Sequence, residues 1–334
     1  RNNVQNEQVG ILRGGSVMAV LDRKEARLKL EAERKKSLIK KNLVNALLYV
    51  IMIVLAVILL IPYVYLVNRS LMTAENAKYS YDFFTHDWQF SNFITLFYDK
   101  TAEGNIANPW AYLDGLKYTA YIIIFNVIAV HLSSSLIAYS FAKLKWVGRN
   151  VMFFLMLGTM MLPAAVTQLP LYVMYSAKGI FGNGGFNWLN TLYPFTIPNL
   201  FGGGAVYIFL IRQFMLGIPK EFDNAAMIDG ANTWQRYFHI TLPLCKPVLI
   251  YVILQVFISY WGDYYGPMVY CDGEKIRTLA QVVYYSTNST DRVGSIKDNI
   301  VMAGAVFMSV IPTVLFAIFQ KQLIDGVNMS GIKG

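Results

Sequence analysis

The stretch Ile218–Pro243 reads IPKEFDNAAMIDGANTWQRYFHITLP and separates two long apolar runs of the chain. Pro219 suits the start of a helix, because its missing N–H needs no partner in the first turn. Glu221 and Asp223 follow with the negative charge that a helix N-terminus favours. Gly230 stands where a glycine commonly ends a helix. The pattern predicts a short helix that starts at Pro219 and ends at Gly230.

The second half of this stretch predicts another short helix. Thr233 can cap its N-terminus, and Trp234, Tyr237 and Phe238 are large side chains at helical spacing. Pro243 is expected to close the segment, because the residue before a proline avoids the helical conformation. The whole stretch therefore reads as a helix–turn–helix.

Both short helices carry features of a docking surface. Ala225 and Ala226 make one face of the first helix small, so another protein could approach its backbone. The large side chains of the second helix would be the anchors of a helix-in-groove contact. An amphipathic helix that rests on lipid fits the same residues. The residue types alone leave both interpretations open.

The spacing of Ala225-Ala226, Gly230, Ile240 and Leu242-Pro243 resembles the EAA loop of permease subunits in binding-protein-dependent ABC importers. In that family the loop is the coupling helix, which docks in a cleft of the ATPase subunit. The coupling residues that the resemblance implies are Glu221, Asp223, Asn224, Ala225, Ala226, Gly230, Trp234, Ile240, Leu242 and Pro243.

One position departs from the family pattern. The family usually has Glu where this chain has Asn224, so a full charge is missing there. Asp223 is adjacent, but successive residues of a helix point about 100° apart. We expect coupling in this chain to depend more on shape than on that charge.

The resemblance to sugar permeases extends beyond the loop. Phe209–Phe214 is similar to the end of their preceding span, and Trp261-Gly262-Asp263 with Gly266-Pro267 is similar to their fifth span. The end of the chain, from Gly326, looks like the tail of the maltose-type second permease, which inserts into the ATPase dimer. That likeness implies ATPase contacts at Gly331, Lys333 and Gly334. Together the resemblance covers residues 43–334.

Composition independently places the chain among membrane proteins. Of its 334 residues 55% are hydrophobic and 15% are charged, whereas soluble domains usually carry about a quarter charged residues. The mean hydropathy is +0.41, and the apolar residues come in long runs. A spanning helix needs roughly 20 mainly apolar residues. The six predicted spans are Leu43–Val67, Leu116–Phe141, Val151–Tyr175, Leu189–Phe214, Lys246–Pro267 and Ile300–Gln320.

We therefore predict an all-α polytopic membrane protein with six transmembrane helices, and the resemblance implies the type I ABC importer (MetI-like) permease fold. The predicted domains are a basic arm (1–42), a six-helix permease domain (43–320) and a C-terminal tail (321–334). The loops 68–115 and 268–299 read as ordered outer surface, although plain connectors fit equally well. Because the chain starts at Arg1 rather than Met, we expect it to be part of a longer protein.

The placement of basic residues predicts the orientation. Eleven of the 29 Lys and Arg residues precede residue 42, and Asp22–Lys41 reads as a charged helix that leads into the first span. With the N-terminus inside, the inner segments hold 20 of the 29. Since cytoplasmic flanks of membrane proteins are rich in Lys and Arg, we expect a multi-pass protein of the bacterial cytoplasmic membrane with both termini in the cytoplasm. This placement also argues against nucleic-acid binding.

Several chemistries are missing from the sequence. It contains no GxxxxGK[ST] motif, and Gly182-Asn183-Gly184-Gly185 lacks the following lysine. No nucleophile elbow or HExxH motif occurs, so no catalytic residue is predicted. Cys245, Cys271 and the three histidines are scattered, so neither a disulfide framework nor a metal site is expected. We predict no cofactor in this chain, with ATP and Mg bound by partner subunits.

The predicted function is that of the permease subunit of an ABC carbohydrate importer. The expected partners are a second permease subunit in a heterodimer, two ATPase subunits, an extracytoplasmic solute-binding protein and an oligosaccharide substrate. The alternative is an ion-coupled secondary transporter, which should carry ionisable residues in its spans. The predicted spans hold few: His131, which we interpret as a packing residue, and Asp263 near the outer end of the fifth span, which is the better cavity candidate. A membrane receptor or scaffold is a third reading.

Sugars need aromatic faces and polar groups. The residues that could line a sugar pathway are Tyr172, Asn199, Gln255, Ser259, Trp261 and Asp263.

Overall fold

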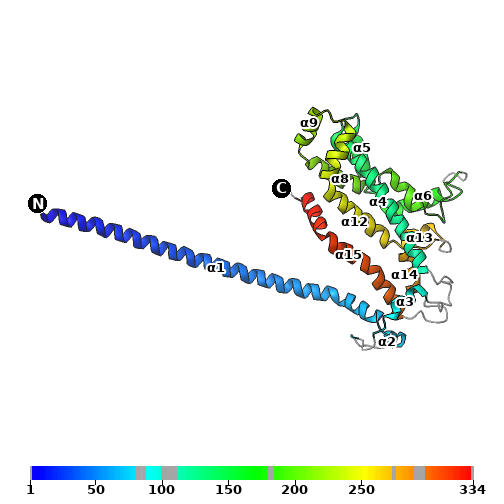
Figure 1. The fold of residues 1–334 in the computed structure, drawn as a ribbon, viewed down its shortest axis with the longest axis horizontal. Helices are drawn as coiled ribbons and strands as arrows, with labels where there is room; N and C mark the ends of the chain where they lie inside the picture. Colours follow the sequence, from blue (N-terminus) through cyan, green and yellow to red (C-terminus); the bar gives the residue numbers. More distant parts are fainter. Residues whose placement is uncertain are drawn as a thin grey trace. The chain divides into compact units, whose positions relative to one another are not determined.

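The computed structural model describes the backbone of residues 2–79, 84, 88–98, 111–179, 184–272, 276–288 and 298–331. Within these residues all regular elements are helical and none is a strand, as the sequence predicts (Figure 1). The chain divides into two units, Arg1–Tyr65 and Leu66–Gly334.

The first unit consists of one helix. The element α1 (Asn2–Ser70) carries the basic arm and the first apolar run without a break, and its last turn belongs to the second unit. The predicted charged helix that leads into the first span is therefore confirmed. The stretch Arg34–Ser70 qualifies as a membrane span because it is long and apolar enough to cross a bilayer.

The second unit is a helix bundle around α4 (Ala111–Lys143). This helix packs against α8 (Ala205–Gly217), α12 (Lys246–Trp261) and α14 (Leu279–Asn288), while α15 (Asp298–Gly331) packs against α12 (Figure 1). Long apolar helices bury one side against such neighbours and leave the other for lipid or partner subunits.

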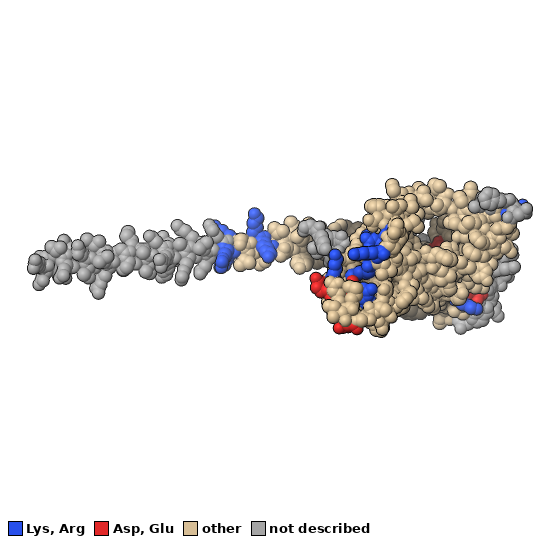
Figure 2. All heavy atoms as spheres, turned by 90° about the horizontal axis from the view of Figure 1, so that it is seen from above, with Lys and Arg blue, Asp and Glu red and all other residues tan. Residues whose placement is uncertain are grey.

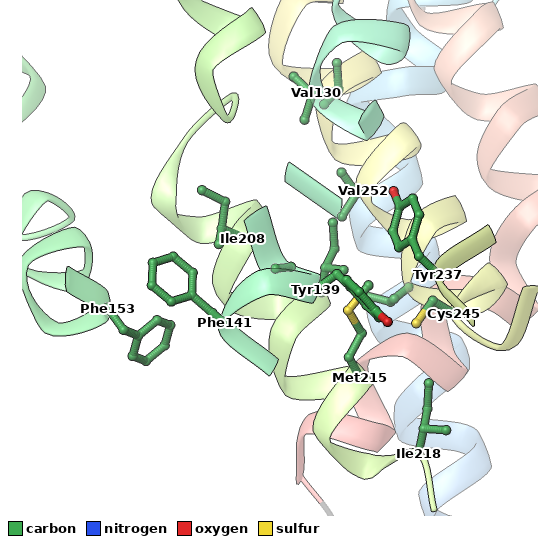
Figure 3. Packing of buried hydrophobic residues seen from close by; sticks show 14 residues of the cluster. Val130, Tyr139, Phe141, Phe153, Ile208, Met215, Ile218, Tyr237, Cys245 and Val252 are labelled. Atoms are coloured by element: carbon green, nitrogen blue, oxygen red, sulfur yellow. The ribbon is translucent and has the colours of Figure 1, made fainter. Parts of the chain in front are cut away.

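Buried side chains hold these helices together at the end of the bundle near α9. Tyr139 on α4, Met215 on α8 and Val252 on α12 belong to one hydrophobic cluster, with Tyr237 and Cys245 from the segment between α8 and α12 (Figure 3). Met215, Val252 and Cys245 are fully buried and Tyr237 is 1% exposed. The segment after α8 is therefore part of the bundle core on one side.

One predicted span is strongly bent, and a second strong bend lies directly before the fifth span. The third span consists of α5 (Arg149–Thr159) and α6 (Ala164–Tyr175), which meet at 96°. Pro163 precedes α6 with an extended ψ of 136°, which a continuous helix cannot contain. The helices before and after Cys245 meet at 75°. Within the described residues four helices are long and apolar enough to span alone, and counting each bent pair as one span raises this number to the predicted six.

The fourth span starts later than predicted, at Tyr193 instead of Leu189. It begins with α7 (Tyr193–Thr196), continues through the 3-10 helix η1 (Ile197–Phe201) and restarts as α8 after three glycines. These glycines have φ values of 116°, 59° and 124°, and a Cβ on Gly203 would lie 2.5 Å from Val130. Only glycine permits this backbone so close to α4.

The fifth span is shorter than predicted. It ends at Trp261 instead of Pro267, because Gly262 and Asp263 interrupt the helix before α13 (Tyr265–Tyr270). The Asp263 side chain accepts the Gly266 N–H at 2.9 Å, and this local bond starts the new helix.

The described parts of both long loops contain helices that pack on the bundle. Helices α2 (Ala74–Tyr79) and α3 (Ser91–Tyr98) lie against α15. Asn299 of α15 donates to the Met72 carbonyl at 3.1 Å and to the Asn92 side chain at 3.0 Å, and all three residues are buried. In the other loop α14 packs on α4, with the Leu279 N–H on the Thr119 hydroxyl at 2.9 Å. These segments are more than connectors.

Candidate coupling site

The first half of the candidate site is a short helix with a well-defined end. Helix α9 (Lys220–Ile228) has Glu221 and Asp223 in its first turn, as predicted, while Pro219 lies one position earlier than expected, at the N-cap. Gly230 has a φ of 78°. The Gly230 N–H bonds to Met227 O at 3.2 Å and the Ala231 N–H to Ala226 O at 2.9 Å. This pair of bonds is the Schellman arrangement, which a glycine in the left-handed region permits.

The second half is capped by a residue that the sequence analysis missed. Helix α10 (Thr233–Arg236) has Asn232 at its N-cap, so the expected cap at Thr233 is wrong. Asn232 Oδ1 accepts the Gln235 N–H at 2.9 Å, and Gln235 Oε1 accepts the Asn232 N–H at 2.8 Å. This is a capping box, and an asparagine three residues before a glutamine was its signal in the sequence.

Pro243 does not close the segment as predicted. A π-helical turn, η2 (Tyr237–Thr241), leads into α11 (Leu242–Leu244), and the bend comes at Cys245. A proline at the second position of α11 is tolerated, because its missing N–H falls in the first turn of that short helix. The coupling segment therefore runs on to Cys245, where the chain bends by 75° into α12.

One face of the segment is held inside the bundle. The Lys143 ammonium, at the end of α4, lies 2.7 Å from the Asp223 carboxylate, and these side chains are 12% and 14% exposed. The Tyr237 hydroxyl lies 2.7 Å from the Ser135 hydroxyl, and its ring packs 5.1 Å from that of Tyr139. Tyr237 is therefore a core residue and not the docking anchor that its sequence position suggested.

The other face is open. Trp234 is 61% exposed and Phe238 51% exposed, with their rings stacked 6.1 Å apart. Ala225 is exposed while Ala226 is buried, so the two alanines do not share one docking face. Among the remaining predicted coupling residues, Glu221, Asn224, Gly230 and Pro243 are exposed, and Ile240 and Leu242 are half-buried. The exposed residues form a surface that another protein could contact.

Three predicted pathway residues have partners within the bundle. Asn199 donates to the Asn126 side-chain oxygen at 2.7 Å and to the Tyr260 hydroxyl at 2.6 Å, so it joins η1 to α4 and α12. Trp261 is buried, and its indole N–H donates to the Met308 carbonyl at 2.8 Å.

Asp263 lies just beyond the last residue of the fifth span. Burial raises the pKa of its carboxyl above the ordinary value, and the N–H groups of Gly266 and Tyr265 oppose that rise. Its backbone carbonyl accepts the Thr278 hydroxyl at 3.1 Å. Asp263 therefore organises the turn between α12 and α13.

The other three predicted pathway residues are less buried. Tyr172 and Ser259 are exposed and Gln255 is half-buried, and the Ser259 hydroxyl donates to the Gln255 carbonyl at 2.8 Å. The two ring nitrogens of His131 lie 2.7 Å from the Val127 carbonyl and 2.9 Å from the Leu249 carbonyl, so the side chain lies between α4 and α12 and the nitrogen that carries the proton donates to one of these carbonyls.

Comparison with known proteins gives the family of the chain. Residues 134–328 match the family of binding-protein-dependent transport system inner membrane components, and these residues include the whole coupling segment. This chain belongs to that family. It is the membrane permease component of a transport system, as the resemblance in its sequence predicts.

Individual relatives of this permease agree with the family match. The chain is 32% identical over 221 residues to the arabinooligosaccharides transport system permease protein AraQ of Halalkalibacterium halodurans, covering 65% of this chain and 72% of that protein. It is 23% identical to the diacetylchitobiose uptake system permease protein NgcG of Streptomyces coelicolor, covering 85% and 87%. A chain from the crystal structure of a bacterial ABC transporter for alginate import has a similar fold, with a TM-score of 0.67 and 24% identity over 84% of this chain and 95% of that one.

Some predicted features of this permease lie outside the described residues. Gly331 is the last residue of α15, whereas Lys333 and Gly334 are not described, so the predicted tail contact stays a prediction. In the described part of the chain no group of three His, Cys, Asp or Glu residues could hold a metal ion.

Asn126 was not among the predicted site residues. This residue is fully buried in α4, and its amide donates to the Phe195 carbonyl at 2.8 Å. A lone asparagine within an apolar span was the available signal, because polar side chains inside membrane helices need partners.

Proposed function

We propose that this permease serves an ATP-driven importer of oligosaccharides. The curated relatives named above transport arabinooligosaccharides or diacetylchitobiose according to their names, and the solved neighbour belongs to an alginate importer. The cargoes in these names are all built of linked sugar units. The observation that carries the proposed mechanism is the two-faced coupling segment, with one side held by α4 and the other open.

The open face is the proposed contact with an ATPase subunit. Trp234 and Phe238 offer a stacked aromatic pair of the kind that anchors a helix in a groove. Asn224 and Glu221 are also exposed, on α9. The chemistry of ATP hydrolysis, with its Mg, would then reside in the partner, and this chain would hold no cofactor.

The face of the coupling segment that contacts α4 is proposed to transmit movement to the bundle. A displacement of α9 and α10 acts on α4 through the Lys143–Asp223 ion pair and the Ser135–Tyr237 hydrogen bond. Because α4 packs against α8 and α12, these helices move with it. Alternating access then results if ATP favours one arrangement of the bundle over the other.

The proposed assembly contains two permease subunits, two ATPase subunits and an extracytoplasmic solute-binding protein. In this arrangement the coupling segment faces the cytoplasm and both termini lie on that side, in agreement with the excess of Lys and Arg in the inner segments. Tyr172, Gln255 and Ser259 are the proposed sugar-pathway residues, while Asn199, Trp261 and Asp263 shape the helices around the pathway.

Reconstitution tests the proposal. The complex purified through this chain is placed in proteoliposomes with ATP inside and candidate oligosaccharides outside, together with the solute-binding protein. Uptake that requires ATP and persists with a proton uncoupler supports the importer. Uptake without ATP that the uncoupler abolishes would establish the ion-coupled transporter instead.

A further inference from the structure

A basic pocket lies at the start of α5, and none of its lining residues is among the candidate coupling residues. It encloses about 300 Å³ and is lined by Lys145, Trp146, Gly148, Arg149, Asn150 and Val151. Figure 2 shows Lys and Arg side chains gathered on the bundle at the end where α5, α8 and α9 lie in Figure 1.

The cations around this pocket lack carboxylate partners among the described residues. The ion pair described nearby is Lys143–Asp223, which leaves Lys145 and Arg149, the two cations that line the pocket, without one. Arg149 donates to the Leu144 carbonyl at 2.9 Å. An anion in the pocket would neutralise this positive charge.

The surface that continues from the pocket is apolar. Val147 is fully exposed, and Val151, Phe154 and Leu155 on α5 are 63%, 70% and 63% exposed. Trp146, at the pocket wall, is an amphipathic side chain of the type that collects at a membrane interface. A ligand that fits both regions needs an anionic head and hydrocarbon chains.

We propose that this pocket binds the phosphate headgroup of an anionic phospholipid, whose acyl chains lie along the exposed side of α5. Lys145 and Arg149 bind the phosphate, and Asn150 is placed to donate a hydrogen bond. Basic pockets beside membrane helices are suited to such headgroups. A free phosphate would leave the apolar strip unused, and a protein partner would have to meet both the cations and the strip.

The test measures lipid binding to the purified, delipidated complex by native mass spectrometry. Phosphatidylglycerol is titrated against phosphatidylcholine, with inorganic phosphate as a separate competitor. The double variant Lys145→Gln/Arg149→Gln should weaken phosphatidylglycerol binding by roughly thirtyfold, because the loss of each cation should weaken it by roughly five- to sixfold. The conservative variant Lys145→Arg/Arg149→Lys should retain binding. The control Lys117→Gln/Lys178→Gln removes two exposed lysines that do not line the pocket, and it should change nothing.

Four outcomes overturn the proposal. Equal binding of the two lipids rejects an anion-selective site, and equal loss in the control variant assigns the effect to net charge. Full displacement by inorganic phosphate assigns the pocket to a soluble anion. Phosphatidylglycerol that binds only after the ATPase subunits are removed would make the pocket a protein interface.

Discussion

The Asp223 carboxylate on α9 lies 2.7 Å from the Lys143 ammonium at the end of α4, and both side chains are largely buried. This ion pair connects the candidate coupling helix directly to the central helix of the bundle. Asp223 was predicted as a contact to the ATPase, but in this structure its charge is already neutralised within the chain. Its role in coupling is therefore proposed to be internal.

Breaking this pair should uncouple transport from ATP hydrolysis. Asp223→Asn leaves the Lys143 charge without its partner, and the loss for a mostly buried pair is about 1–3 kcal/mol. We expect a lower unfolding temperature and at least a severalfold loss of uptake per ATP hydrolysed in proteoliposomes. The exchanged pair Lys143→Asp/Asp223→Lys should recover part of both. A single variant with unchanged uptake and unfolding temperature would show that the pair transmits nothing.

Tyr237 should matter for stability, whereas its exposed neighbour Trp234 should matter for docking. Tyr237→Phe removes the hydrogen bond to Ser135 at a cost of about 1 kcal/mol, and Tyr237→Ala leaves a cavity that costs about 3–5 kcal/mol. Trp234→Ala should leave the unfolding temperature nearly unchanged, because the side chain is 61% exposed. Thermal unfolding and co-purification of the ATPase subunit separate these effects. Equal destabilisation by Trp234→Ala would contradict the two-faced segment.

Gly230 should be important for ATP-driven uptake because of its backbone conformation, whereas the Asn224 side chain should contribute little. No atom lies within 4 Å of a Cβ built on Gly230, so its φ of 78° alone penalises other residues. Gly230→Ala should cost about 1 kcal/mol, and Gly230→Pro more, because proline cannot adopt a positive φ. We expect Gly230→Pro to abolish ATP-driven uptake and Asn224→Ala to reduce it mildly. Coupling by shape is refuted if both variants lose uptake equally.

Asp263 should destabilise the fold as its carboxyl ionises. Burial raises its pKa above the ordinary value for an aspartate, so the folded state holds the proton more tightly than the unfolded state. The sign follows from this difference: stability is greatest below about pH 4 and decreases as the pH rises through the folded-state pKa.

Asp263→Asn tests that sign. Asparagine keeps the side-chain oxygen that accepts the Gly266 N–H and carries no charge. The unfolding temperature of this variant relative to the native chain should therefore rise between pH 4 and pH 7. Asp263→Ala loses the acceptor as well and should be less stable than Asp263→Asn at both pH values. A difference that does not depend on pH would exclude the buried carboxyl as its cause.

Local sequence signals determined the short helices well. The Gly230 terminus, the acidic first turn of α9 and the apolar spans follow from neighbouring residues, because capping and hydrophobic length act over a few positions. The membrane class and the family likewise needed only composition and the spacing between Ala225 and Pro243. Thr233 was a wrong cap because two good capping residues stand side by side, and only the bonds of Asn232 distinguish them.

Tertiary structure alone decided which side of each helix faces inward. Tyr237 and Phe238 are adjacent aromatic residues, yet the first is buried against Ser135 and the second is exposed, since Tyr237 lies against α4 in this bundle. Lys143 and Asp223 are 80 residues apart in the chain, and no periodicity connects them. Partners brought together across the bundle depend on how whole helices pack and bend, which neither residue encodes by itself.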